Sequence, residues 1–60
     1  MFDVEVGQER KWFVSGKVFT VESKIEGTAF YVCRNEDGTE EHHDGFIVNC
    51  RSYILKEREN

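Results

Sequence analysis

Two adjacent histidines set among carboxylates, in the segment Glu40-Glu41-His42-His43-Asp44, offer the most obvious chemistry in this 60-residue chain. Imidazole and carboxylate groups bind zinc and other divalent cations. Adjacent side chains of a strand point to opposite faces, so His42 and His43 cannot both reach one ion. No third histidine or cysteine cluster completes a ligand set. We therefore expect no metal and no cofactor, and we interpret the segment as a short edge strand protected by its charge.

Cys33 and Cys50 are the other reactive side chains. A thiol nucleophile needs a base and an orienting group beside it, and His42 or His43 could lie across a hairpin from Cys33. Nothing in the sequence supplies an oxyanion hole, and a β-barrel of this size is filled by its own side chains. We therefore expect no catalytic residue and a chain that is not an enzyme. Both thiols are expected to be free in a reducing compartment, with a disulfide as the alternative.

The acidic residues are concentrated in one segment. The formal net charge is −4 and the pI about 5.0, yet residues 36–44 hold five of the twelve acids and no Lys or Arg. These five are Glu36, Asp37, Glu40, Glu41 and Asp44. An acidic hairpin can steer a protein toward a basic partner surface or imitate DNA phosphates; the alternative is solvated charge at a loop tip. The acidic balance also disfavours nucleic acid as a partner.

The elements that must position these residues are strands. The sequence has no proline, weak helix signals and recurring Val, Phe, Tyr, Ile and Thr, which suit a pleated sheet. Strands are predicted at 2–6, 12–14, 17–25, 29–34 and 46–50, with a charged edge strand at 40–44 and a last strand or single helical turn at 53–55. Residues 8–11 are predicted to be a polar connection. Asp37-Gly38 favours a tight hairpin turn, because glycine readily adopts the positive φ that such turns require.

A chain of this length holds one thin core. The apolar alternating positions predict its members as Phe2 or Val4, Phe13, Phe19, Val21, Phe30, Val32, Ile47 or Val48, and Tyr53 or Leu55. Trp12 and Tyr31 are predicted to be interface anchors, since Trp and Tyr are enriched at interface hot spots, with the core as the alternative for Trp12. We expect a single domain over residues 1–56 and a charged tail over residues 57–60.

Three segments resemble small SH3-like barrel proteins of bacteriophages. They are Gly16-Lys17-Val18-Phe19-Thr20-Val21, Phe30-Tyr31-Val32 and Asn35-Glu36-Asp37-Gly38-Thr39-Glu40. Arg51-Ser52-Tyr53 is a loose match to the Arg–aromatic pair near the C-terminus of those proteins. The resemblance, over roughly residues 12–55, implies an all-β fold: a single small antiparallel SH3-like barrel of five or six strands. It also implies a binding module without a cofactor, which docks on a host enzyme or defence protein.

The leading hypothesis is a non-catalytic protein-interaction module, phage-encoded, that acts as an inhibitor or adaptor of a host protein. Its surface would combine the five acids of residues 36–44 with Tyr31 or Trp12. One alternative is a nucleic-acid-binding barrel that uses Arg10, Lys11, Lys17, Arg34 and Arg51. The other is a homo-oligomer, such as a homodimer, formed through an exposed strand edge. Without a leader or an apolar run of ~18 residues, we expect a soluble, cytoplasmic protein that does not enter a membrane.

Overall fold

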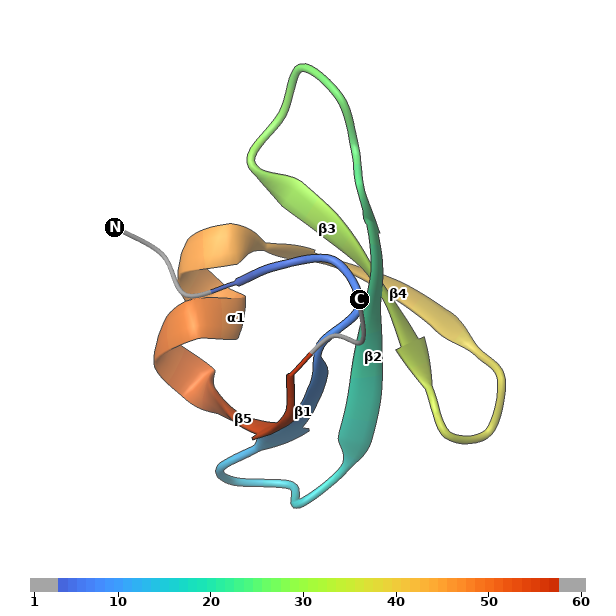
Figure 1. Ribbon diagram of the computed structural model, residues 1–60, viewed down its shortest axis with the longest axis vertical. Coiled ribbons are helices and arrows are strands. Elements are labelled where there is room, and N and C mark those ends of the chain that lie inside the picture. The colour runs from blue at the N-terminus through green and yellow to red at the C-terminus, as the bar shows by residue number, and fades with distance from the viewer. Residues whose placement is uncertain (1–3, 58–60) are drawn as a thin grey trace.

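The computed structural model describes residues 4–57, which form a five-stranded antiparallel sheet and one short helix (Figure 1). In chain order the elements are β1 (Glu9–Trp12), β2 (Val18–Lys24), β3 (Phe30–Asn35), β4 (Glu40–Asp44), α1 (Gly45–Arg51) and β5 (Ser52–Lys56). The expectation of a mainly β protein is confirmed, since α1 has only seven residues. None of the helical structure within residues 4–57 has the length and apolar character needed to cross a membrane.

The sheet is open rather than closed. Its strands lie in the order β4-β3-β2-β1-β5, so β4 and β5 are the two edges, and no pairing between them occurs within residues 4–57. Helix α1 connects these edges and packs against both of them (Figure 1). The predicted closed barrel is therefore wrong, because the helix lies where closure would have required β4 and β5 to pair.

Strands β2, β3 and β4, which we call the hairpin region (residues 18–44), follow the sequence prediction closely. Each strand pairs antiparallel with the next one along the chain, in a register that sets Val21 opposite Cys33 and Cys33 opposite Glu41. The turn at Asp37-Gly38 is confirmed. Gly38 has φ 90°, and the Asn35 N–H donates to the Thr39 carbonyl at 2.8 Å. Local pairing and turn chemistry account for this region.

The first strand differs from the prediction. Residues 2 and 3 lie outside the described residues, and 4–7 form no strand, although Val4 is buried. Phe13 and Val14 belong to the turn after β1. Strand β1 is formed instead by the polar stretch that was predicted to be a connection, and Arg10 is its buried side chain, only 2% exposed. Alternation of apolar residues does not predict β1, because its inward position carries the charged side chain of Arg10, which donates hydrogen bonds to buried acceptors.

The predicted strand at 46–50 is wrong, because this segment is helix α1. Asp44 precedes the helix and its Oδ1 accepts a hydrogen bond from the Phe46 N–H at 2.8 Å, which caps the first turn. Val48 faces the core and is fully buried, whereas Phe46 is 57% exposed. The following segment confirms the strand alternative at 53–55. Glu57 follows β5 without regular structure, and the rest of the predicted tail lies outside the described residues.

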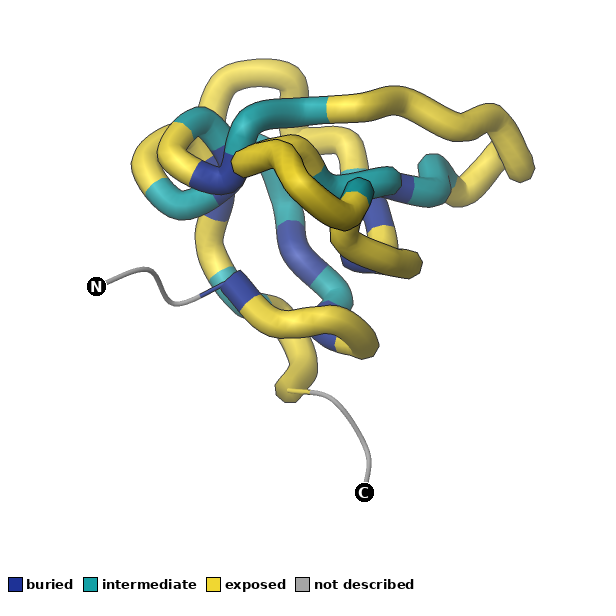
Figure 2. The backbone as a smooth tube through the Cα atoms, turned by 90° about the horizontal axis from the view of Figure 1, so that it is seen from above, coloured by how far each residue is buried: buried dark blue, intermediate teal, exposed yellow. Residues whose placement is uncertain are grey.

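The core is small and lies between the sheet and α1. Figure 2 shows buried segments confined to short stretches of a largely exposed tube. The members of the core are Val4, Phe19, Val21, Cys33 and Val48, with Trp12 and Tyr31 packed against them. Four predicted positions are confirmed: Phe19, Val21, Val4 and Val48.

Several predicted core residues face outward instead. Phe13, Phe30, Tyr53 and Leu55 are exposed and Val32 is half-buried. In β3 the inward face carries Cys33, which is buried, so the alternation of this strand is one residue out of step with the prediction. A shift of one residue reverses every side chain of a strand, which explains why Phe30 and Val32 fail together.

Candidate functional site

A groove opens between the turn after β1, strand β4 and helix α1. It has a volume of about 470 Å³ and is open to solvent. Its lining includes Trp12, Val14, Lys17, His43, Ile47 and Arg51, joined by Glu41 and Asn35 on the β3–β4 side. Non-local pairing creates this groove, because β1 and β5 bring Trp12 opposite Ser52, next to the end of α1.

An aromatic stack forms the floor of the groove. The ring of Trp12 stacks on that of buried Phe19, with centroids 4.6 Å apart and planes inclined by 24°. The imidazole of His43 meets Trp12 nearly edge-on, at 4.9 Å and 67°. Contacts of this kind stabilise an aromatic pair beyond the area that it buries. Trp12 is therefore half-buried and held in one orientation, which suits a preformed binding surface.

A chain of hydrogen bonds holds the adjacent wall. Glu41 uses one carboxylate oxygen on His43 Nε2, at 2.8 Å, and accepts from Asn35 Nδ2 with the other, at 3.2 Å. Asn35 Nδ2 also donates to Thr39 Oγ1 at 3.0 Å. The hydrogen bond to His43 is the main cause that lowers the pKa of Glu41, followed by the bond from Asn35. The carboxylate is thus committed to its neighbours in the wall.

The turn over residues 13–17 projects beside the groove on a braced backbone. The Trp12 N–H donates to the Lys17 carbonyl at 3.0 Å, and the Gly16 N–H to the Trp12 carbonyl at 3.1 Å. Gly16 adopts φ 73°, which glycine reaches without strain. The Phe13 N–H extends the ladder to the Arg51 carbonyl, at 3.0 Å. This turn is therefore tied to both β2 and the end of α1.

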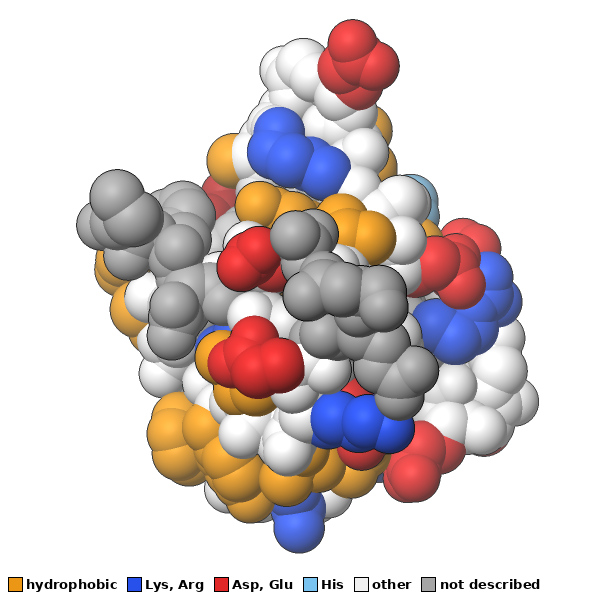
Figure 3. Space-filling view, in the orientation of Figure 1, with side chains coloured by type: hydrophobic (Ala, Val, Ile, Leu, Met, Phe, Trp, Pro, Cys, Tyr) orange, Lys and Arg blue, Asp and Glu red, His pale blue; other side chains and the backbone are white. Residues whose placement is uncertain are grey.

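Apolar side chains are exposed on this turn. Phe13 is 62% exposed and Val14 fully exposed, and the ring of Phe13 rests against Tyr53 of β5 with centroids 5.1 Å apart. We call Phe13, Val14 and Tyr53 the apolar ridge. Figure 3 shows hydrophobic atoms gathered along the lower edge of the molecule, where Figure 1 places the β1–β2 turn and β5. An exposed aromatic pair beside a groove is typical of an interaction surface.

The structure separates the predicted site residues. Trp12 and Glu41 both line the groove. Tyr31 lies away from them, half-buried against the core, with its Cε1 at only 2.9 Å from where a Cβ on Gly45 would stand. Asp44 caps α1. Tyr31 and Asp44 therefore have structural contacts that account for their presence.

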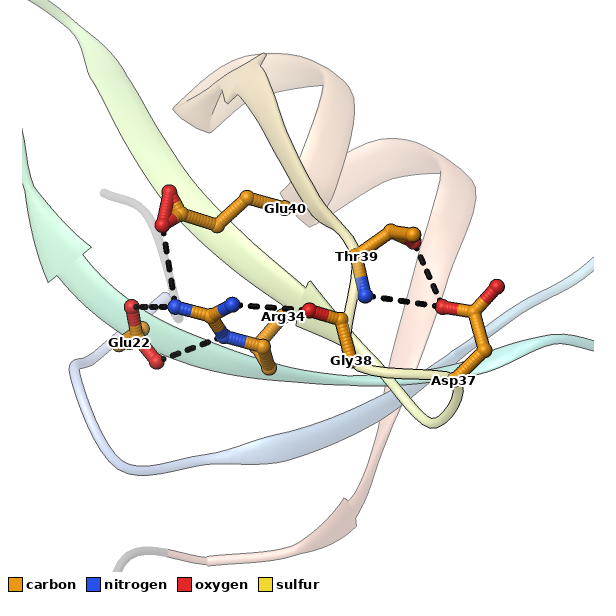
Figure 4. Close-up of polar contacts among 6 residues, drawn as sticks. All are labelled: Glu22, Arg34, Asp37, Gly38, Thr39 and Glu40. Carbon is orange, nitrogen blue, oxygen red and sulfur yellow. Dashed lines mark hydrogen bonds and ion pairs between the residues drawn. The ribbon is translucent and has the colours of Figure 1, made fainter.

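Glu40 belongs to an ion-pair network on the outer face of the hairpin region (Figure 4). The Arg34 guanidinium donates to both oxygens of Glu22, at 3.0 and 2.9 Å, and to Glu40 Oε1 at 3.0 Å. Its remaining nitrogen, Nη1, donates to the Gly38 carbonyl at 2.8 Å. The bond from Arg34 lowers the pKa of Glu22. Arg34 thus fastens the tip of the hairpin to β2.

The two remaining acids lie at the hairpin tip. Asp37 accepts from both the backbone N–H and the hydroxyl of Thr39, at 3.0 and 2.6 Å, and these bonds lower its pKa. Glu36 is exposed. Together with Glu41 they line a smaller hollow of about 220 Å³ beside Lys17. The acidic segment is therefore partly neutralised by its own contacts, and its free charge is concentrated at the tip.

The two thiols and the possible metal ligands are the other groups that could carry chemistry. Both cysteines are free; Cys33 is buried and Cys50 exposed. Burial raises the pKa of Cys33 to about 11, so this thiol is protonated at neutral pH and a poor nucleophile. Within residues 4–57 no group of three His, Cys, Asp or Glu side chains is placed to hold a metal ion.

A buried polar network escaped the sequence reasoning. Arg10 donates to Gln8 Oε1 at 3.0 Å, to Ser52 Oγ at 2.8 Å and to the carbonyls of Ser52 and Val48 at 3.1 and 3.4 Å. The Ser52 hydroxyl also bonds the Val48 carbonyl. The two buried side chains Gln8 and Arg10 are two positions apart, and this spacing is the signal in the sequence that indicates a strand. Polar residues at successive positions disfavour a strand in which one face is buried, which is why the sequence predicts a connection here.

Comparison with known proteins adds no relative. No protein-family model matches the chain, and neither the curated proteins nor the solved structures yield a match.

Proposed function

We propose that this chain is a non-catalytic protein-interaction module that binds a partner through the groove and the adjacent apolar ridge. The carrying observation is the exposed Phe13–Tyr53 pair beside a groove floored by Trp12. A domain with so few apolar residues in its core would gain stability by burying these rings. Their exposure on a braced turn is therefore better explained by contact with another molecule.

The fold supports a relationship to SH3-like domains at a coarser level than a closed barrel. The segments that carry the resemblance fall on β2, on β3 and on the β3–β4 hairpin, while the Arg–aromatic match falls on the end of α1 and β5. We propose an open variant of that architecture. A phage origin and a host protein as the partner rest on this resemblance alone and stay predictions.

Nucleic acid fits the charge distribution less well. Of the bases in that alternative, Arg10 is buried in a hydrogen-bond network and Arg34 is held by two carboxylates. Binding of a phosphate backbone needs several cations free to replace counterions. Self-association through a strand edge is also disfavoured. Three of the five residues of β4 are acidic. The pairing of β5 with β1 is irregular, because Glu9 lies opposite Lys56 but Arg10 lies opposite Ile54. Charge and irregularity both discourage an edge strand from pairing with another copy.

A selection of random peptides displayed on yeast against the biotinylated full chain tests the proposed function. We expect enriched peptides that bind the chain and lose at least about tenfold in affinity when Phe13→Ser removes the ridge ring, because central aromatic anchors dominate binding energy. The matched control is Phe46→Ser, since Phe46 is similarly exposed, at 57% against 62%, but lies on α1. Circular dichroism verifies that both variants fold.

Two results would contradict the proposal. One is a selection that enriches no peptide above background. The other is a set of binders that weaken as much with Phe46→Ser as with Phe13→Ser, because the contact would then lie elsewhere on the chain.

A further inference from the structure

We infer that the groove recognises a peptide segment that presents a carboxylate next to a large apolar side chain. This inference rests on the proposed function and names the chemistry of the occupant. It reverses the expectation that an acidic hairpin would select a basic partner, and it follows from how the chain uses its cations.

Three of the seven bases described in residues 4–57 are engaged by other groups of the protein. Arg10 is buried and Arg34 is bound by Glu22, Glu40 and the hairpin backbone. Lys24 donates to the Thr28 carbonyl. Lys17 and Arg51 differ: both line the groove, both are exposed, and within residues 4–57 neither side chain forms an ion pair or hydrogen bond. Lys17 and Arg51 are therefore the two cations that the groove offers to a ligand.

The one acid on the groove wall offsets only part of the positive charge of these two cations. Both oxygens of Glu41 are occupied, one by His43 and the other by Asn35. A ligand therefore meets two cations without a hydrogen bond or ion pair, although the charge of Lys17 also acts on Glu41 and Asp37, and one carboxylate whose oxygens are already bonded. Within a protein of net charge −4, this groove is a locally cationic site.

The remaining lining is apolar. Trp12, Ile47 and Val14 line the groove with an aromatic ring and two branched aliphatic side chains. A ligand that carried charge alone would leave this surface in contact with water. An apolar side chain adjacent to the carboxylate would bury it, at roughly 25 cal/mol per Å² of apolar area.

The neighbouring hairpin tip favours a peptide over a polynucleotide. Glu36 and Asp37 lie at the hollow beside Lys17, so a row of phosphates that left the groove on this side would meet like charge. A segment with a single carboxylate avoids that repulsion. An aspartate or glutamate side chain in an extended protein segment satisfies both conditions.

The test is a titration of the isotope-labelled full chain, followed by amide NMR shifts and by the fluorescence of Trp12, the one tryptophan. The probes are three acetylated, amidated peptides, Gly-Phe-Glu-Leu-Gly and its twins with Gln or Lys in place of Glu. We expect shifts at the groove residues and an affinity order of Glu over Gln over Lys. Each step should be about two- to fivefold, the range of exposed charge pairs.

Charge reversal of the groove cations sharpens the assignment. Lys17→Glu and Arg51→Glu should each abolish the preference for the Glu peptide over the Gln peptide. Lys24→Glu is the matched control, because it makes the same change of charge on an exposed base outside the groove and should leave the preference intact.

The failures of the two proposals are distinguishable. Binding of the Lys peptide equal to or tighter than the Glu peptide would overturn the carboxylate assignment while leaving an interaction module in place. A yeast selection whose binders carry no excess of acidic residues would do the same. Inorganic phosphate or a decamer of thymidylate that displaced the Glu peptide at equal concentration would overturn the peptide assignment. No shift with any of the three peptides at millimolar concentration would overturn the inference. The function itself fails if the selection finds no binder, or if its binders weaken as much with Phe46→Ser as with Phe13→Ser.

Discussion

The hairpin region and the part formed by β1, α1 and β5 differ in the kind of side chain that they bury. In the hairpin region consecutive strands pair with one another and bury Phe19, Val21 and Cys33. In the other part, strands distant in sequence pair, and the buried side chains include Gln8, Arg10 and Ser52. One half is held by apolar contacts between neighbours, and the other by a polar network that spans 42 positions from Arg10 to Ser52.

This difference accounts for the exposed surface. Arg10 of β1 is buried and bonded to Ser52 of β5, whereas the rings of Phe13, in the turn after β1, and Tyr53, in β5, are exposed and pack against each other. A buried arginine that finds acceptors can replace apolar side chains without unpaired groups, and every buried side-chain nitrogen and oxygen of residues 4–57 has a partner. The buried network of Arg10 and the exposed apolar ridge thus occur in the same part of the molecule, one inside it and the other on its surface.

The largest expected effect comes from removal of Arg10. Arg10→Ala removes the guanidinium that donates to the Gln8 amide oxygen, the Ser52 hydroxyl and the carbonyls of Val48 and Ser52, and it opens a cavity. A buried acceptor that loses its donor costs about 1–3 kcal/mol and the cavity adds to this, so the loss should be a large fraction of the total stability of a domain this small. Urea unfolding followed by circular dichroism measures the loss.

Arg34→Ala is the matched control in the hairpin region. Its guanidinium also donates four hydrogen bonds, but it is 39% exposed and its partners can turn to water. An exposed ion-pair network contributes little to stability because water screens it, so this variant should stay close to the parent. Equal losses for the two variants would remove the distinction between the regions.

The same contrast explains what the sequence could predict. Strands β2, β3 and β4 and the turn at Gly38 follow from local signals: alternation, β-branched residues and an Asp-Gly pair. Strand β1 could not be found in that way, because its inward position carries Arg10, and acceptors for a guanidinium are contributed by Ser52 and Val48 from the far end of the chain. The period of two survived there, but with polar residues on the buried side.

The candidate site was predicted in part for the same reason. Trp12 and Glu41 were singled out by residue type and charge, and both line the groove. Ile47 and Arg51 reach it only because residues 45–51 form helix α1, whose first turn Asp44 caps. A segment rich in branched residues favours a strand in isolation. The cap and the packing of Val48 reverse that preference.

The junction between the two regions gives an intermediate effect. Asp44→Ala removes the acceptor of the Phe46 N–H and should destabilise the domain by about 1 kcal/mol, the usual value for the loss of an N-cap. Asp44→Asn keeps an oxygen acceptor and should recover most of this loss. Thermal unfolding of the two variants separates a capping role from a partner-binding role. A binding role for the charge would leave both equally stable and weaken the selected peptides equally.

The smallest effect concerns the groove wall, where the hairpin region meets the ridge. The pKa of Glu41 is lowered by its bonds to His43 and Asn35, so the folded state holds this proton less tightly than the unfolded chain. The stabilisation is therefore present above the unfolded pKa of an ordinary glutamate, near 4.5, and is lost as the pH falls through the lower folded value. Because the side chain is half-exposed, the contribution should stay below about 1 kcal/mol.

Glu41→Gln should flatten the fall of unfolding free energy between neutral pH and pH 3, measured in urea at several pH values. Glu36→Gln is the control, since Glu36 is exposed at the hairpin tip and lies outside this hydrogen-bonded wall. Trp12 fluorescence reports whether the aromatic floor follows, because His43 touches both Glu41 and the indole. If the two variants showed the same acid dependence, the wall would not be fixed by Glu41, and the orientation of His43 over Trp12 would have to come from packing alone.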